Sequence, residues 1–281
     1  MKSLKQWIFI LIALIMIGAV AVVIVLNKDE KRSKGITISD SKVFSEEIKE
    51  VVVEVGACEF ELMESTSGET RLEYDNVMME YFTGEVEDGV LTIRYEPKGQ
   101  NITVNFFGIK FGGGMDSVES KIVLQIPKDV CYEKVTMKFG AADVKAEQIA
   151  AKQLMIEVGA GRFEADTVLA ENEANISVGA GAFYASEVAL ANAELHCGVG
   201  EMEMTGSVTG KSFVECGVGE VELVLEGNEE DYCGELDCGL GEIVFGDMSI
   251  GGSGKKDFGV SDAAYQMDVK CGVGEVEIRF E

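Results

Sequence analysis

The sequence predicts an all-β chain that forms a single-stranded, β-helix-like β-solenoid of short coils, preceded by one transmembrane helix. A glycine-centred unit recurs about every 20 residues, apolar residues alternate on both sides of each glycine pair, and 33 glycines accompany only 2 prolines among 281 residues. A fixed period of this length is typical of stacked repeats. Alternation with period two is typical of strands that bury one face.

The charge balance limits the partners that we expect. Lysine and arginine number 24 against 50 for aspartate and glutamate, so the net charge is -26. Nucleic-acid binding needs a basic surface, and we therefore expect no nucleic-acid partner. The 47% of hydrophobic residues is enough for a chain of this length to bury a core.

The N-terminus predicts a membrane anchor. Residues 7–26, "WIFILIALIMIGAVAVVIVL", carry no charge, and a helix of this length spans a bilayer core of about 30 Å. A cleaved signal peptide ending near Ala19-Val20-Ala21 is the alternative, but the apolar run is longer than a typical signal core. We expect residues 1–6 to be cytoplasmic and the polar stretch 27–35, "NKDEKRSKG", to be a linker.

The orientation of this anchor does not follow from charge counting. Lys2 and Lys5 precede the apolar segment, and four basic residues follow it between 28 and 34, so the flanking charges do not favour export of the C-terminal part. We nevertheless expect a single-pass protein of the cell membrane with an extracellular C-terminal domain, on the grounds of the family resemblance given below.

Residues 36–136 predict a β-rich N-terminal part that caps the solenoid. Alternating stretches such as "VVVEVGACEFEL" and "IVLQIPKDV" are separated by turn residues, and Asp88-Gly89 between "GEVE" and "VLTIRY" is typical of a hairpin. The stretch 106–117, "FFGIKFGGGMDS", is expected to be a loop. Such a cap would cover strand edges that the first coil otherwise leaves open.

Residues 137–281 predict the solenoid itself, with six to seven coils of about 19 to 20 residues. Units centred on Gly140, Gly159, Gly179, Gly198 and Gly217 are spaced by 19, 20, 19 and 19 residues, and two longer spacings of 22 and 33 lead to Gly239 and Gly272. The Gly-x-Gly of each unit is interpreted as a corner where a positive φ lets the chain turn. An aliphatic residue such as Val168 or Val188 predicts a third short strand in each coil.

These stretches together resemble a known family. The order "FSEEIKEVVVEVGACEFEL", "GEVEDGVLTIRYEPKG", "IVLQIPKDV" and "IEVGAGRFEADTVLAENEANISVGAGAF" resembles the bacterial putative-adhesin family of β-strand repeat domains, a domain of unknown function common in Gram-positive envelope proteins. The resemblance covers residues 36–281. It implies a β-solenoid tethered by one N-terminal helix, with links to envelope-stress operons in some members, and it implies no catalytic residues.

Four units depart from that pattern by carrying cysteine before the first glycine. Cys197, Cys216, Cys238 and Cys271 stand where other units have Val55, Phe139, Val158 or Val178. Alternation turns this position inward, so we interpret the four as a column of small buried apolar side chains. Zinc or an iron-sulfur cluster would need four thiolates that converge on one point, and parallel side chains give poor disulfide geometry.

The glutamates after the corners predict rows on the outer face. One row holds Glu201, Glu220, Glu242 and Glu275, and a second holds Glu203, Glu222 and Glu277. Like charges about 5 Å apart repel by about 1 kcal/mol in water. The side chains therefore either spread into solvent or are bridged by a cation such as Ca²⁺, and spreading is the simpler interpretation because calcium sites usually combine six or more oxygens.

No motif predicts an enzyme, and we expect no catalytic, cofactor-binding or metal-ligating residue. The stretch "SIGGSGKK" at 249–256 differs from a phosphate-binding loop at Ser249 and Lys256. The single histidine, His196, is expected to point outward. The function we expect is a surface for envelope structure, adhesion or binding of an envelope protein or glycan; the alternatives are an accessory or sensor protein in envelope-stress signalling and a calcium-binding, carbohydrate-active protein.

Overall fold

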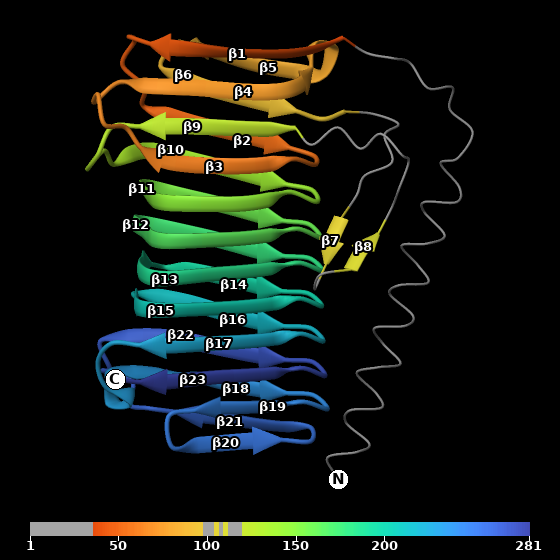
Figure 1. The fold of residues 1–281 in the computed structure, drawn as a ribbon. Coiled ribbons are helices and arrows are strands. Elements are labelled where there is room, and N and C mark those ends of the chain that lie inside the picture. Colours follow the sequence, from red (N-terminus) through yellow and green to blue (C-terminus); the bar gives the residue numbers. More distant parts are fainter. Residues whose placement is uncertain (1–35, 98–103, 107–108, 112–119) are drawn as a thin grey trace.

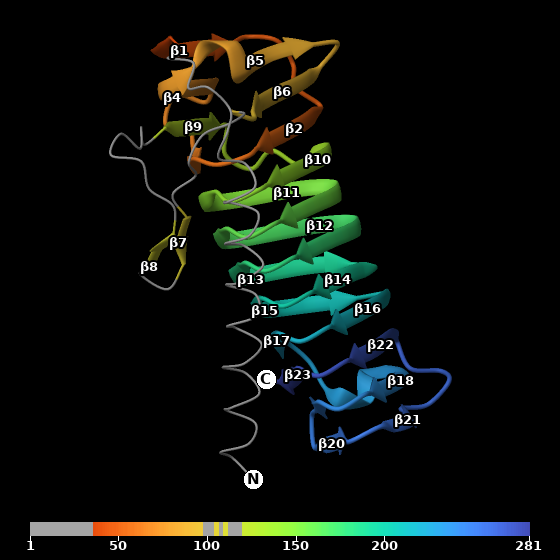
Figure 2. The same cartoon turned by 90° about the vertical axis from the view of Figure 1, so that its right-hand side faces the viewer.

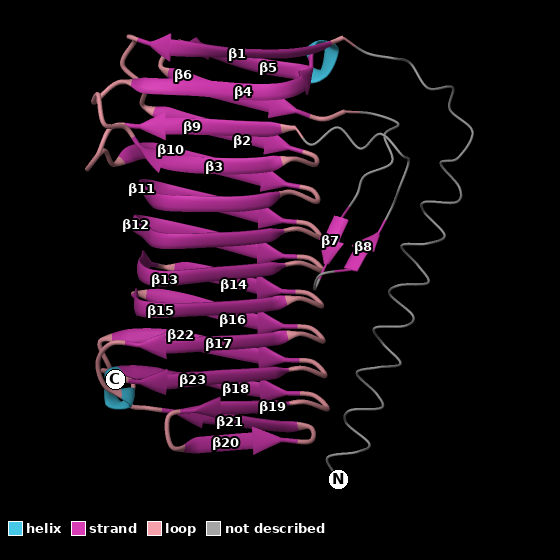
Figure 3. Ribbon diagram, in the orientation of Figure 1, coloured by secondary structure: helices cyan, strands magenta, loops and turns pink. Residues whose placement is uncertain are grey.

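Two faces of stacked strands, joined by glycine corners, make up the protein (Figures 1 and 3). The computed structural model describes residues 36–97, 104–106, 109–111 and 120–281. The expected N-terminus 1–6, anchor 7–26 and linker 27–35 lie outside these residues. Within the part that is described, no helix is both long and apolar enough to cross a bilayer.

One face holds the strands that lead into the glycine corners. Its order along the stack is β5 (Phe82–Glu87), β6 (Val90–Tyr95), β2 (Glu50–Val55), β10 (Tyr132–Phe139), the ends of β11 (Asp143–Val158) and β12 (Arg162–Val178), β14 (Ala193–Cys197), β16 (Lys211–Cys216), β22 (Tyr265–Cys271), β18 (Tyr232–Cys238) and β21 (Gly254–Phe258). We call it the entry face.

The exit face holds the strands that leave the corners. Its order is β1 (Thr37–Phe44), β4 (Thr70–Met78), β9 (Lys121–Ile126), β3 (Glu59–Glu64), the starts of β11 and β12, β13 (Ala182–Ala191), β15 (Glu201–Thr209), β17 (Glu220–Leu225), β23 (Glu275–Phe280), β19 (Glu242–Phe245) and β20 (Met248–Gly251). Two short 3₁₀ turns, η1 (Met79–Tyr81) and η2 (Glu229–Asp231), precede β5 and β18.

Alternation along each strand builds the core between the two faces. In β2 the side chains of Val51, Val53 and Val55 are buried, and the residues between them are only half-buried. The predicted third segment is present in the middle coils, where residues 148–151, 167–170 and 187–190 pair in parallel from coil to coil, but the coils of β17, β23 and β19 show no corresponding pairing. The alternation of apolar residues in the sequence therefore matches the alternation of buried side chains in the structure.

The corner glycines are required by close stacking and not by a left-handed backbone. No corner glycine from Gly56 to Gly274 in the stack has a φ between +20° and +160°, so the prediction of a positive φ was wrong. A Cβ on Gly159 would lie 2.5 Å from the carbonyl oxygen of Gly140, and one on Gly161 would lie 2.0 Å from that of Ala142. Each corner sits directly on the one before it, because the amide of Gly159 donates to Phe139 O and that of Ala160 to Gly140 O.

The order of coils in the stack differs from their order in the sequence at both ends. The coil of β2 and β3 stacks in parallel register on β10 and β11, so it joins the solenoid although it lies within the stretch 36–136 expected to form the cap. The coil of β22 and β23 is inserted between the coil of β16 and β17 and the coil of β18 and β19. Figure 1 shows that the coil of β22 and β23, although it comes last in the sequence, does not lie at the end of the stack.

Antiparallel strands close both ends of an otherwise parallel stack. At one end β5 pairs antiparallel with β6, β1 with β4 and β4 with β9; at the other, β20 pairs antiparallel with β19 and β21 with β18. The predicted hairpin at Asp88-Gly89 is confirmed, with φ of 50° and 80°. The stretch 106–117 is not wholly a loop, because β7 (Val104–Phe106) pairs with β8 (Ile109–Phe111) beside the main stack (Figure 2).

Candidate functional site

The four cysteines of the repeated motif form one continuous column inside the solenoid. The register pairs Cys197 with Cys216, Cys216 with Cys271, and Cys271 with Cys238. All four side chains are buried, with exposed fractions of 1 to 3%. The prediction that cysteine replaces an inward valine is therefore confirmed, and the insertion of β22 changes only the order of the last two.

Neighbouring thiols in this column interact and shift one another's acidity. A hydrogen bond to the Cys216 thiol lowers the pKa of Cys197, while the same bond raises the pKa of Cys216 to about 12. For Cys271, the hydrogen bond to Cys216 and then burial raise the pKa. The pKa is thus raised for Cys216, Cys271 and Cys238, the last mainly by burial, while the Cys197 thiol donates to Glu220 O over 3.7 Å.

The outward glutamates also form rows, in the same stack order as the cysteines. Glu201 pairs with Glu220, Glu220 with Glu275, and Glu275 with Glu242, which confirms the predicted register of the first row. In the second row Glu203 pairs with Glu222 and Glu222 with Glu277, and Arg279 binds both Glu222 and Glu277. We call these two sets the carboxylate rows.

Burial, followed by the proximity of other glutamates, raises the pKa of two members of the carboxylate rows. For Glu220, burial and then the charges of Glu275 and Glu201 raise the pKa; for Glu203, burial and then a hydrogen bond that its protonated carboxyl donates to Glu201 do so. The exit face therefore concentrates negative charge, and neighbouring carboxylates repel one another. A bound cationic group would reduce this repulsion.

Tyr184 takes part in this face and does not stand out in the sequence. Its hydroxyl donates a 2.5 Å hydrogen bond to Glu201 Oε2, and the guanidinium of Arg162 lies 4.9 Å from its ring centroid. Burial and then this hydrogen bond raise the pKa of Tyr184. Tyr184 aligns with Glu203 in the neighbouring coil, so the alignment of units could have placed it beside the rows, but no motif marks it.

The weaker sequence candidates are scattered over the stack. His196 lies on the entry face, where its Nδ1 is 3.2 Å from Glu215 Oε2 and its ring is 5.7 Å from that of Phe213. The stretch 249–256 covers most of β20, the turn at residues 252–253 and the start of β21, so it leads into a strand and not into a helix. The structure therefore does not bring His196, the 249–256 turn and the carboxylate rows into one site.

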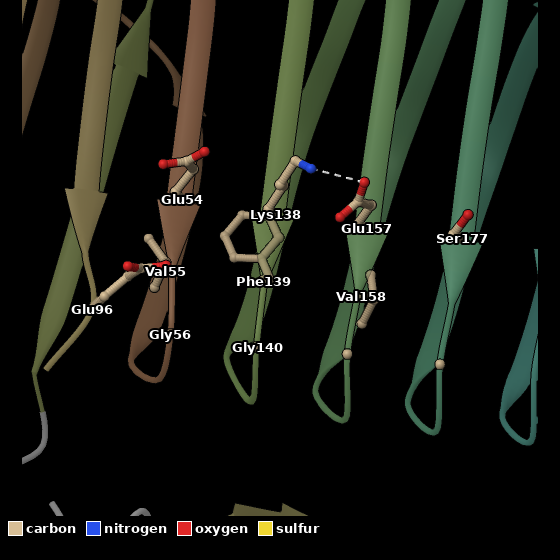
Figure 4. A pocket seen from close by; sticks show the side chains of 12 residues that line it. Glu54, Val55, Gly56, Glu96, Lys138, Phe139, Gly140, Glu157, Val158 and Ser177 are labelled. Carbon is tan, nitrogen blue, oxygen red and sulfur yellow. Dashed lines mark hydrogen bonds and ion pairs between the residues drawn. The ribbon is translucent and has the colours of Figure 1, made fainter. Parts of the chain in front are cut away.

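A shallow hollow lies beside the corners of the entry face toward the N-terminal end (Figure 4). Its lining includes Glu54, Glu96, Lys138 and Glu157, and the Lys138 Nζ pairs with Glu157 Oε1 at 2.9 Å. The rest of the lining is largely corner backbone. This hollow therefore offers a few charged side chains above the corner glycines, and this arrangement does not define a reaction.

The histidine, cysteine and acidic side chains do not converge as a cluster of three or more that could hold a metal ion, as far as the chain is described. The carboxylate rows run along the stack and therefore present pairs of oxygens on successive rungs. Calcium usually takes six or more oxygens around one point. Extended binding of cationic groups fits the rows better than a closed calcium cage does.

Comparisons with known proteins find one matching family and several distantly similar solved structures. Residues 48–279 match the family model described as Toastrack DUF4097. A solved putative adhesin from Bacteroides fragilis is 14% identical with a TM-score of 0.43, over 88% of this chain and 98% of that one. A putative cell adhesion protein from Clostridium sporogenes is 11% identical with a TM-score of 0.34, over 88% and 100%.

A third solved structure, described as a putative lipid binding protein from Parabacteroides distasonis, is 14% identical with a TM-score of 0.29, over 88% of this chain and 99% of that one. None of the curated proteins matches this chain. The likenesses to solved structures are too distant to carry a functional argument, but the family match spans most of the chain and confirms the resemblance drawn from the repeats. The chain belongs to the Toastrack DUF4097 family.

Proposed function

We propose that this protein is a membrane-anchored, extracytoplasmic and non-enzymatic β-solenoid that binds a cationic component of the cell envelope or a partner protein through its carboxylate rows. The observation that carries the proposal is the first row, which places Glu201, Glu220, Glu275 and Glu242 on four successive rungs of one face. A rigid parallel ladder fixes these charges about 4.8 Å apart. Such a field attracts cationic groups and speeds their association.

The anchor supports the cellular part of the proposal. The uncharged segment 7–26 is long enough to span a bilayer, and the linker 27–35 would hold the solenoid near the membrane. Intact cells that express Ser33→Cys in a background without other cysteines should react with a membrane-impermeant thiol reagent. If cells label only after lysis, residue 33 faces the cytoplasm and the extracytoplasmic part of the proposal fails.

Binding is tested with full-length protein in detergent and purified wall fragments of the source organism. The triple variant Glu203→Gln, Glu220→Gln, Glu275→Gln removes three charges from the rows. A matched control removes three exposed charges elsewhere, through Glu46→Gln, Glu69→Gln and Glu87→Gln. We expect salt-sensitive retention that falls at least tenfold in the row variant and remains in the control.

Equal loss in both triple variants would mean that net charge, and not the rows, governs binding. If the wild-type protein is not retained at all, but its deletion changes survival under wall-active antibiotics, the alternative role in envelope-stress signalling takes its place. If the row variant is retained as well as the wild type, the carboxylate rows are not the binding surface.

A further inference from the structure

The residue between the two glycines of each corner forms an apolar row on the outside of the C-terminal coils. In the four Cys-Gly-x-Gly-Glu units, x is valine three times and leucine once. The corners line one edge of the stack (Figure 3). The backbone amides of Val218, Val273 and Leu240 each donate to the first glycine of the neighbouring corner, so these corners stack directly. We call this row the corner ridge; in stack order it consists of Val199, Val218, Val273 and Leu240.

The corner ridge is open to solvent although it is apolar. The exposed fractions are 37% for Val199, 39% for Val273 and 75% for Leu240, and Val218 is half-buried. Single exposed apolar residues are common on protein surfaces, whereas a contiguous apolar row beside polar residues is typical of an interaction site. The ridge is therefore a surface that a partner could cover.

The corners of the N-terminal coils do not combine these features. Their middle residues are all alanine, and the residues two positions later differ in charge. The middle residues are Ala57, Ala141, Ala160 and Ala180, and those two positions later are Glu59, Asp143, Arg162 and Ala182. A larger aliphatic residue followed two positions later by glutamate thus occurs in the four C-terminal coils and not in the four N-terminal ones. This contrast within one chain links the ridge to the first carboxylate row.

The first carboxylate row runs beside the ridge on the exit side. Two residues of chain span at most about 7 Å, so each ridge residue lies close to the glutamate that follows it. Arg279 pairs with glutamates of the second row. Among the residues that the structure describes, no lysine or arginine forms an ion pair with Glu201, Glu220 or Glu275 of the first row. The ridge is therefore flanked on this side by carboxylates whose charge is available to a partner.

The entry side of the ridge has no such excess of charge. Its outward residues just before the corners alternate in sign, because Lys270 lies between Glu215 and Asp237 on adjacent rungs. The Lys270 ammonium also lies over the ring of Phe213, 5.1 Å from its centroid. Cationic groups of a partner are consequently attracted to the exit side, which fixes how a bound segment would be rotated about its own axis.

We propose that the corner ridge and the first carboxylate row together bind an amphipathic helix of a partner protein. The helix places an apolar stripe on the ridge and a neighbouring stripe of lysine or arginine on the glutamates. This inference names the partner of the carboxylate rows and so rests on the proposed function. Charge complementarity selects a basic helix, whereas an anionic lipid surface would be repelled by the row.

The spacing of the rungs favours a helix over an extended strand. Four rungs about 4.8 Å apart span about 14 Å. Apolar residues at positions i, i+4, i+7 and i+11 of a helix span about 16 Å, whereas four residues on one face of a strand span about 20 Å. A helix about 10 to 12 Å wide covers the ridge and the adjacent row together. The bound helix therefore lies along the axis of the stack.

The test measures binding of a fluorescent peptide to full-length protein held on beads in a non-ionic detergent. The peptide has about 20 residues, which is long enough to form a helix, with leucine at i, i+4, i+7 and i+11 and lysine on the neighbouring stripe. A second peptide of the same composition has its order scrambled, so that neither stripe forms. We expect the scrambled peptide to bind at least about tenfold more weakly, because it cannot bury leucine and pair lysine on one side.

A ridge variant replaces the aliphatic side chains with polar ones of similar size, which keeps the shape of each corner. The variant is Val199→Thr, Val218→Thr, Val273→Thr, Leu240→Asn. The matched control changes the same corner position in the N-terminal coils, through Ala57→Ser, Ala141→Ser, Ala160→Ser and Ala180→Ser. We expect the ridge variant to bind the striped peptide at least about tenfold more weakly because the apolar contact is lost, and the control to bind like the wild type.

Thermal melts show whether the ridge variant is folded. If it melts well below the wild type, Leu240→Asn alone replaces it, because this side chain is 75% exposed; it should weaken peptide binding by about threefold. The inference is overturned if the ridge variant, or this single variant in its place, binds the striped peptide like the wild type, or if the scrambled peptide binds as tightly as the striped one. Self-association that the ridge variant abolishes, without any peptide binding, assigns the ridge to a second copy and also overturns it.

Retention on wall fragments separates this inference from the proposed function. If the triple variant of the carboxylate rows loses retention while the ridge variant still binds the peptide normally, the proposed function stands and the helix site is wrong. If peptide binding needs the ridge but wall retention does not need the rows, the helix site stands and wall binding through the rows is wrong.

Discussion

The sulfur of Cys216 lies 2.8 Å from the point that a Cβ on Gly274 would occupy. The same point is 2.0 Å from the carbonyl oxygen of Gly219. Cysteine and glycine of the repeated motif are therefore coupled across rungs: the side chain before one corner fills the space that the second glycine of the next corner leaves free.

Gly274→Ala should consequently destabilise the protein strongly. The added methyl group would meet backbone as well as the Cys216 sulfur, and backbone in a stacked corner cannot move without shifting its neighbours. Overpacking of a core costs about 1 to 3 kcal/mol, and more where backbone must move, so we expect a loss of about 3 kcal/mol or more in the free energy of unfolding. Val273→Ala, one residue away with a side chain 39% exposed, is the control and should cost under about 1 kcal/mol. Similar melting temperatures for both variants would contradict the close-contact account.

Cys216→Val should leave stability nearly unchanged, whereas Cys216→Ser should not. Val178 already places its Cγ1 2.9 Å from the Cβ point of Gly200, so valine fits this arrangement. Serine places a hydroxyl in an apolar column, which costs about 1 to 3 kcal/mol when the group finds no good partner. Chemical denaturation of the two variants measures the difference. If serine is tolerated as well as valine, the position is not the dry core position that we describe.

Stability should rise as the pH falls from neutral toward the range where glutamate titrates. The pKa of Glu220 is raised in the folded protein, first by burial and then by Glu275 and Glu201. A carboxyl with a raised folded pKa costs stability while it is charged, and this cost fades as the pH falls through the folded pKa and is absent below the unfolded pKa. Glu220→Gln should therefore melt higher than the wild type at pH 7 and equally at acid pH. Glu69→Gln, exposed in a turn, is the control; a pH-independent gain in Glu220→Gln would contradict the argument.

Calcium should stabilise the protein no more than magnesium does at equal ionic strength. The carboxylate rows repel along the stack, and any salt screens that repulsion. Thermal melts in NaCl, MgCl₂ and CaCl₂ of matched ionic strength should therefore rise together. A large additional rise with calcium would show a specific site in the rows and would revive the calcium-binding alternative.

Because the coil of β22 and β23 lies between the coil of β16 and β17 and the coil of β18 and β19, the structure predicts which outward residues lie on adjacent rungs. Glu215 pairs with Lys270, and Lys270 pairs with Asp237, so Glu215 and Asp237 are two rungs apart. In a background where the column cysteines are valine and the other cysteines are removed, Glu215→Cys with Lys270→Cys should react with a short bifunctional thiol reagent. The pair Glu215→Cys with Asp237→Cys should react far less. The opposite result would mean that the coils stack in sequence order.

Much of this fold follows from the sequence, because the physical signals are local. The 19 to 20 residue spacing and the alternation around Cys216 are enough to predict parallel coils with cysteine inside and glutamate outside. The position of β22 could not be predicted, because "CGVGEVEI" and "CGLGEIVF" are so alike that either coil could follow β16 and β17. The hydrogen bond from Tyr184 to Glu201 depends on contact between neighbouring rungs, which alternation within one coil does not reveal.

Thiol reactivity tests the central claim, that Cys-Gly-x-Gly-Glu is a folding unit with an inward cysteine and an outward glutamate. In the variant Cys58→Ala, Cys131→Ser, Cys233→Ala, the remaining thiols are those of Cys197, Cys216, Cys238 and Cys271, which are 1 to 3% exposed. The account predicts that a bulky thiol reagent modifies none of the four in the folded protein and all four after unfolding. Rapid modification of the four thiols in the folded protein would contradict it.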